Sequence, residues 1–83
     1  MNTNIRTQDK RIKHTTFTDL VNANAIRRVE VHNDGKWWVL IRVGNVERIL
    51  SVKRGHTRRF SSLDSVVKYL QSVGVQRFNV ELV

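Results

Sequence analysis

The stretch from residue 27 to residue 52 constrains the fold more than any other part of the sequence. Residues 27–32 alternate polar and apolar side chains, which is the period of a β-strand. The Asp34-Gly35 pair that follows favours the positive φ angles of a tight hairpin turn, and residues 37–43 are mainly aromatic and β-branched. Gly44-Asn45 marks a second turn before a third run over residues 46–52. The pattern therefore predicts a three-stranded antiparallel meander.

Helices are expected on both sides of this meander. Residues 16–19 carry a threonine N-cap signal and an acidic first turn, so one short helix is expected over residues 19–24. Between Leu63 and Val73 apolar residues recur at helical spacing. A sequence resembling a capping box opens this segment, and Gly74 follows it as a C-cap signal. Residues 78–82 alternate again and predict a last strand.

These elements predict an α+β fold with the order α-β-β-β-α-β. The three-stranded antiparallel meander and a C-terminal strand are expected to pack against one long amphipathic helix, since neither apolar surface is stable in water. Residues 16–83 are expected to form one single domain, because an 83-residue chain allows no more. Residues 1–15 are rich in Lys and Arg and show no apolar period, so they are expected to form a flexible basic N-terminal tail.

Composition and residue spacing argue against catalysis and against a metal site. The chain has no cysteine, which excludes thiolate chemistry, disulfides and cysteine-based zinc sites. His14, His32 and His56 lie in separate segments without the spacing of metal ligands. The carboxylates occur singly, whereas acid–base catalysis needs positioned pairs, and no glycine-rich phosphate loop is present. We therefore expect a non-enzymatic protein without a metal or a cofactor.

Hydropathy gives an expectation about location. The longest unbroken apolar run extends from Trp37 to Ile41, whereas a membrane span needs about 20 residues. The N-terminus is polar and lacks the apolar segment of a signal peptide. A cytoplasmic protein without membrane contact is expected.

Charge points to an acidic partner. The formal net charge is +8, from 15 Lys and Arg against 7 Asp and Glu. The densest run is the loop at residues 53–59, where no carboxylate interrupts the cations. Such a loop can contact phosphates and release counterions, or it can simply be a solvated loop that keeps a sheet edge from pairing. The residues expected to contact phosphate in this loop are Lys53, Arg54, His56, Arg58 and Arg59.

Two further groups extend the candidate nucleic-acid interface. Trp38 shares the parity of Arg42 in the second strand, so an exposed indole among arginines could stack bases. The alternative is that the tryptophans belong to the core or to a dimer interface. Lys10, Arg11 and Lys13 could form an arm along the phosphate backbone, or belong to a tail without function.

The chain resembles small plasmid partition-associated proteins of the ParC-like family. The run from Arg59 to Leu82, which contains Ser-Ser-Leu-Asp-Ser-Val-Val-Lys-Tyr-Leu, is similar to the C-terminal half of that family. Residues 20–50 are similar to its first half, with Ala25-Ile26-Arg27 leading into a strand, followed by Gly-Lys-Trp-Trp and Val-Glu-Arg. The resemblance covers about residues 18–83. It implies a bacterial origin on plasmids or mobile elements and a role near segregation, and it carries over no catalytic residue.

Together these observations predict a non-enzymatic accessory protein of plasmid maintenance that binds nucleic acid through its basic loop and tail. DNA is favoured over RNA as the partner. The alternative is a protein–protein adaptor or inhibitor that uses the same charges to bind an acidic protein. A homodimer is compatible with both hypotheses. A chain this short buries only about 60% of the surface that its unfolded form exposes, and dimerisation would bury more.

Overall fold

The computed structural model describes residues 10–82. In this part of the chain, two helices and five strands follow one another in the order β-α-β-β-β-α-β. Their bounds are β1 (Arg11–Ile12), α2 (His14–Asn22), β2 (Arg28–Asn33), β3 (Trp37–Val43), β4 (Val46–Leu50), α3 (Leu63–Val73) and β5 (Asn79–Glu81).

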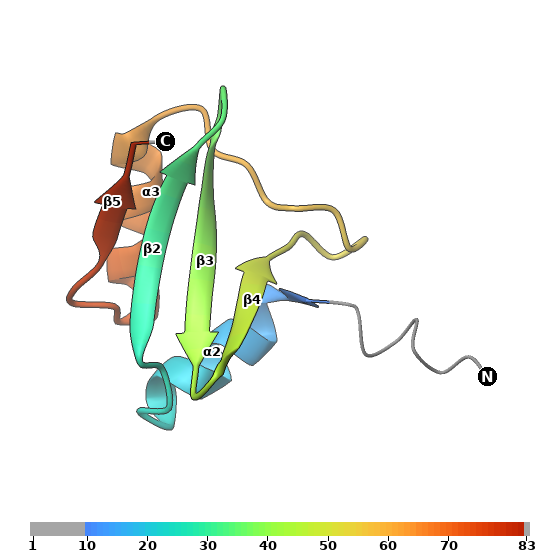
Figure 1. Ribbon diagram of the computed structural model, residues 1–83, viewed down its shortest axis with the longest axis vertical. Coiled ribbons are helices and arrows are strands. Elements are labelled where there is room, and N and C mark those ends of the chain that lie inside the picture. Colours follow the sequence, from blue (N-terminus) through green and yellow to red (C-terminus); the bar gives the residue numbers. More distant parts are fainter. Residues whose placement is uncertain (1–9, 83) are drawn as a thin grey trace.

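The strands form one mixed sheet in the order β1-β4-β3-β2-β5. The middle three pair antiparallel, so the expected meander is present as β2, β3 and β4. Each outer strand pairs parallel with its neighbour, β1 with β4 and β5 with β2. Both helices cover the same face of the sheet (Figure 1). The opposite face, which we call the open face, carries no helix within the described residues.

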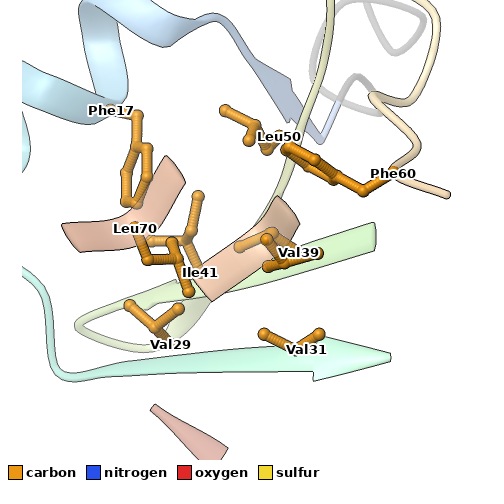
Figure 2. Close-up of a cluster of buried hydrophobic side chains, with 9 residues drawn as sticks. Phe17, Val29, Val31, Val39, Ile41, Leu50, Phe60 and Leu70 are labelled. Carbon is orange, nitrogen blue, oxygen red and sulfur yellow. The ribbon is translucent and has the colours of Figure 1, made fainter. Parts of the chain in front are cut away.

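The core lies between the sheet and the two helices. Alternating residues of β2 and β3 point toward the helices, and Phe17 of α2 and Leu70 of α3 meet them there (Figure 2). Phe17 and Leu70 are fully buried. The buried cluster consists of Phe17, Val29, Val31, Val39, Ile41, Leu50, Phe60, Val66 and Leu70.

The expected order α-β-β-β-α-β was wrong, because the described part of the chain begins with a strand. The backbone N–H of Ile49 donates to the Lys10 carbonyl at 2.6 Å, and that of Ser51 donates to the Ile12 carbonyl at 2.8 Å. Ile12 also packs against the core. A two-residue strand is too short to show an alternating pattern, so backbone pairing defines it where side-chain periodicity could not.

The first helix also differs from the expectation. It begins at His14 with Lys13 as N-cap residue and without a side-chain capping bond, so Thr16 lies inside the helix. Residues 10–15, expected as part of a flexible basic tail, thus contain β1 and the start of α2. The assigned tail residues 1–9 lie outside the described residues.

The prediction of one long helix against the sheet was wrong as well. Helix α2 has nine residues and α3 has eleven, and both contribute buried side chains to the core. Helix α3 begins where its sequence predicts, since the Ser62 hydroxyl accepts the Ser65 N–H at 3.1 Å. It ends at Gly74, whose φ of 97° is accessible to glycine at little cost.

The segment after β4 runs back toward the start of β3. Arg58 N–H donates to the Leu50 carbonyl at 2.9 Å, and Ser51 and Thr57 form a bridge. Farther along, Phe60 and Trp37 exchange two backbone hydrogen bonds, of 2.8 and 2.9 Å. Residues 57–60 therefore connect the end of β4 with the start of β3. The basic loop projects from this connection.

No helix within residues 10–82 is long and apolar enough to cross a membrane.

Replacing Phe17 by Ala should destabilise the fold by about 3–5 kcal/mol, because the ring is fully buried where α2 docks on the sheet. Urea unfolding followed by circular dichroism measures the change. The Thr16→Ala variant is the control and should stay within about 0.5 kcal/mol of the wild type, since Thr16 is exposed inside the helix. A loss of about 1 kcal/mol in Thr16→Ala would instead indicate an N-cap role.

Candidate nucleic-acid interface

The pairing of β1 with β4 brings two basic segments of the sequence together. Lys10, Arg11 and Lys13 lie in and beside β1, and the loop at residues 52–57 follows β4 directly. The Arg11 guanidinium donates to the Gly55 carbonyl at 2.6 Å, which ties the two segments to each other. We call this surface the basic edge; it consists of Lys10, Arg11, Lys13, Lys53, Arg54 and His56. It lies on the β1 and β4 side of the sheet (Figure 1).

Backbone hydrogen bonds give the loop of the basic edge a defined shape. Val52 N–H donates to the His56 carbonyl at 2.8 Å, and Gly55 N–H donates to the Val52 carbonyl at 2.9 Å. Gly55 has a φ of 91°, a conformation that other residues rarely adopt. Lys53 and Arg54 therefore sit at the exposed tip of a closed turn.

The cations of the basic edge contrast with Arg28, Arg42 and Arg59, which are paired with carboxylates. Lys10, Lys13, Lys53 and Arg54 are all exposed, and none forms an ion pair with a described carboxylate. A buried charge needs a partner within the protein. These four charges are exposed to solvent and need none. The basic edge is therefore a positive surface available to an external anion.

Two arginines of the predicted site have other contacts. The Arg58 guanidinium lies 5.0 Å from the centroid of the Phe60 ring and 4.6 Å from that of Tyr69, so it covers the aromatic part of the core. Burial raises the pKa of the Tyr69 hydroxyl, although the nearby Arg58 charge acts in the opposite direction. Arg59 donates to the Asp34 carboxylate at 2.6 Å. Arg58 and Arg59 thus both have partners among the described residues, unlike Lys53 and Arg54.

Arg42 belongs to a network on the open face, not to the basic edge. Its guanidinium contacts the Glu30 carboxylate at 3.2 Å and the Glu47 carboxylate at 2.6 Å. Glu30 also pairs with Arg28 at 3.0 Å and with His32 at 3.0 Å. Arg28 and Arg42 are thus paired with carboxylates of their own or a neighbouring strand.

Glu30 is a buried carboxylate, and its environment changes its acidity. Burial alone raises its pKa, but hydrogen bonds from His32 and Arg42 and the charges of Arg42 and Arg28 outweigh that effect. The net result is a pKa below the ordinary value of 4.5. The ionised form of Glu30 is therefore stabilised by folding.

Trp38 lies on the open face but is already stacked within the protein. Its ring is 4.6 Å from that of His32, with an interplanar angle of 18°. The indole Nε1 is buried and has no hydrogen-bond partner among the described residues. Trp37 points to the other face and packs against the core. The structure therefore separates Trp38 and Arg42 from the loop and tail residues with which the sequence grouped them.

A cationic cleft at the opposite corner was not identified from the sequence. An open cleft of about 520 Å³ lies between the ends of the two helices, with Arg27, Arg28 and Arg77 in its lining. Arg27 and Arg77 form no ion pair with the described residues. Arg27 and Arg77 are far apart in the sequence, so the sequence did not indicate that they line one cleft. They do so because β5 pairs with β2.

Within residues 10–82, no group of His, Asp or Glu side chains is arranged to hold a metal ion.

The Glu30→Gln variant should be less stable than the wild type by about 1–3 kcal/mol at neutral pH, because charged hydrogen bonds to His32 and Arg42 are lost. The folded-state pKa of Glu30 is depressed, so its stabilisation is present above pH 4.5 and is lost as the pH falls through the folded value. The difference between the two proteins should therefore narrow in acid, as measured by urea unfolding across a pH series.

Glu47→Gln is the matched control for this measurement. Its carboxylate is 42% exposed and pairs with Arg42 alone, so the loss should stay within about 1 kcal/mol. Equal losses in the two variants at neutral pH would contradict the role assigned to the buried Glu30.

Comparison with known proteins places the chain in a family. No curated protein sequence matches it. The ParC-like family profile matches residues 12–83, which confirms the resemblance seen in the sequence and includes every strand and helix except the first residue of β1. The chain belongs to the ParC-like family.

Proposed function

We propose that this protein is a non-enzymatic accessory protein of plasmid partition that binds nucleic acid, DNA in preference to RNA, through its basic edge. The observation that carries the proposal is the juxtaposition of Lys10 and Lys13 with Lys53 and Arg54. These cations come from two segments of the chain, and they form no ion pair with the described carboxylates. Membership in the ParC-like family supports the plasmid context.

Phosphate contact is the chemistry that suits this surface. Exposed Lys and Arg side chains neutralise phosphates and release the counterions condensed on the nucleic acid. The closed turn at residues 52–56 limits the backbone freedom that binding would otherwise have to restrict. The Gly55 contact holds Arg11 beside the turn, so both segments can meet the same phosphate backbone.

The open face is not included in the proposed interface. Arg28 and Arg42 are paired with Glu30, Glu47 and Glu81, so a bound phosphate would have to compete with carboxylates. Trp38 would have to leave its stack with His32 before it could stack on a base. Affinity is therefore assigned to the basic edge and not to the open face.

The proposed binding selects sequence weakly. Contacts to phosphates fix position but do not distinguish bases. Helix α3 presents Lys68 to solvent, and this cation lies 3.4 Å from Asp64 on the same helix, which leaves no basic helix face for a groove. Any strong choice of DNA sequence would then come from a partner protein.

The test is a titration of duplex DNA binding from low to high salt, using the Lys53→Gln/Arg54→Gln variant. Each lost phosphate contact should lower the slope of log affinity against log salt by about 0.9, so the double variant should lose about 2 units of slope. Fluorescence anisotropy with labelled duplex, single-stranded DNA and RNA measures affinity and preference in one series.

Lys36→Gln/Lys68→Gln is the matched control, since it removes the same charge from exposed residues outside the basic edge. Its slope should stay within about 0.5 of the wild type, because only contacting cations release counterions. Equal losses in both double variants would show that net charge, not the basic edge, drives binding. Absence of binding at low salt would reject the proposal and leave an acidic protein as the partner to seek.

A further inference from the structure

The strand β5 forms the edge of the sheet that lies opposite the basic edge (Figure 1). It pairs with β2 on one side and has no strand on its other side within the described residues. Val80 in this strand is 39% exposed, and Leu82 directly after the strand is 79% exposed. An unpaired strand edge with exposed apolar residues is able to pair with another strand.

The residues around β5 are complementary to themselves when two copies run antiparallel. With Asn79 of one copy opposite Asn79 of the other, Val80 faces Phe78 and Glu81 faces Arg77 in both directions. Directly opposite residues in an antiparallel pair have Cβ atoms about 4.5–5.5 Å apart, which suits apolar contact and ion pairing. One register thus matches apolar with apolar and cation with anion.

The structure places Phe78, Val80 and Glu81 on the faces that such pairing needs. Val80 is the sheet partner of the buried Val31, so it lies on the face covered by the helices, where Phe78 also packs against the core. Glu81 lies on the open face, with its carboxylate 3.8 Å from the Arg28 guanidinium. Arg77 lies two residues before β5, in the lining of the cationic cleft, and forms no ion pair with the described residues. Extending the strand by these two residues would give Arg77 the parity of Glu81.

We propose that β5 is a homodimer interface, in which two copies pair antiparallel about Asn79 and extend the sheet across both. Such a contact is isologous, since residue 77 meets residue 81 and residue 81 meets residue 77. The occupant is a second copy because the complementarity is of the segment with itself. The apolar side chains of both copies then gather beside the two α3 helices, and the ion pairs form on the open face.

The proposal does not rest on nucleic-acid binding, and it is tested without nucleic acid. Sedimentation equilibrium over the micromolar to millimolar range should give a mass about twice that of the 9.7 kDa chain. The Val80→Lys variant should be monomeric, because a lysine on an edge strand opposes pairing. Val46→Lys is the matched control; this valine is 46% exposed near the β3–β4 turn, and the variant should dimerise like the wild type.

A charge exchange tests the register. The Arg77→Glu variant places Glu opposite Glu81, and the Glu81→Arg variant places Arg opposite Arg77, so each alone should dissociate at least tenfold more readily than the wild type. When the two variants are mixed, every facing pair is again of opposite sign, and a heterodimer should form with near wild-type affinity. Native mass spectrometry distinguishes this heterodimer from either homodimer.

Three results would overturn the proposal. One is a monomeric wild type throughout the concentration range. Another is a dimer that Val80→Lys and Arg77→Glu leave intact, which would place the interface elsewhere. The third is failure of the mixture to form heterodimers while each variant keeps the circular dichroism of the wild type, which would exclude this register.

Discussion

The backbone pairing of residues 10–12 with β4 is the interaction on which the arrangement of this protein depends. Two hydrogen bonds, from Ile49 to Lys10 and from Ser51 to Ile12, join the N-terminal segment to the sheet. Because α2 starts only two residues after β1, this pairing also positions the helix on the face of the sheet where Phe17 is buried. The same pairing sets the cations of β1 beside the loop that follows β4. Fold and candidate site therefore share one structural cause.

Carboxylate placement divides the charge of the molecule into distinct surfaces. Glu30, Glu47 and Glu81 all lie on the open face, where they pair with arginines of β2 and β3. Asp34 holds Arg59 near the β2–β3 turn, and Asp64 lies beside Lys68 on α3. These carboxylates do not reach the basic edge, nor Arg27 and Arg77 in the cleft, and the cations there that form no ion pair with a described residue face solvent. A protein with the same net charge but with carboxylates in β1 and in the loop at residues 52–57 would present no such edge.

Local patterns in the sequence predicted the elements with strong periodicity and missed those defined by distant partners. The meander and α3 follow from alternation, turn residues and the Ser62 cap, all of which act within a few residues. The strand β1 and the parallel pairing of β5 depend on backbone contacts across the chain, which side-chain periodicity does not encode. The same limit applies to the site: charge density identified Lys53 and Arg54, but only the tertiary fold separates them from Arg42 and Arg59.

The two edges of the sheet suit different partners. The β5 edge is complementary to itself, whereas the basic edge would repel a second copy of itself. Pairing through β5 would leave the basic edges at the outer margins of a ten-stranded sheet, at most roughly 43 Å apart at about 4.8 Å per strand. Two linked copies of the proposed phosphate-binding surface at that separation would be able to engage one duplex together, and the second contact would gain from the high effective concentration set by the first. Dimerisation would thus raise affinity for DNA without adding any base-specific contact.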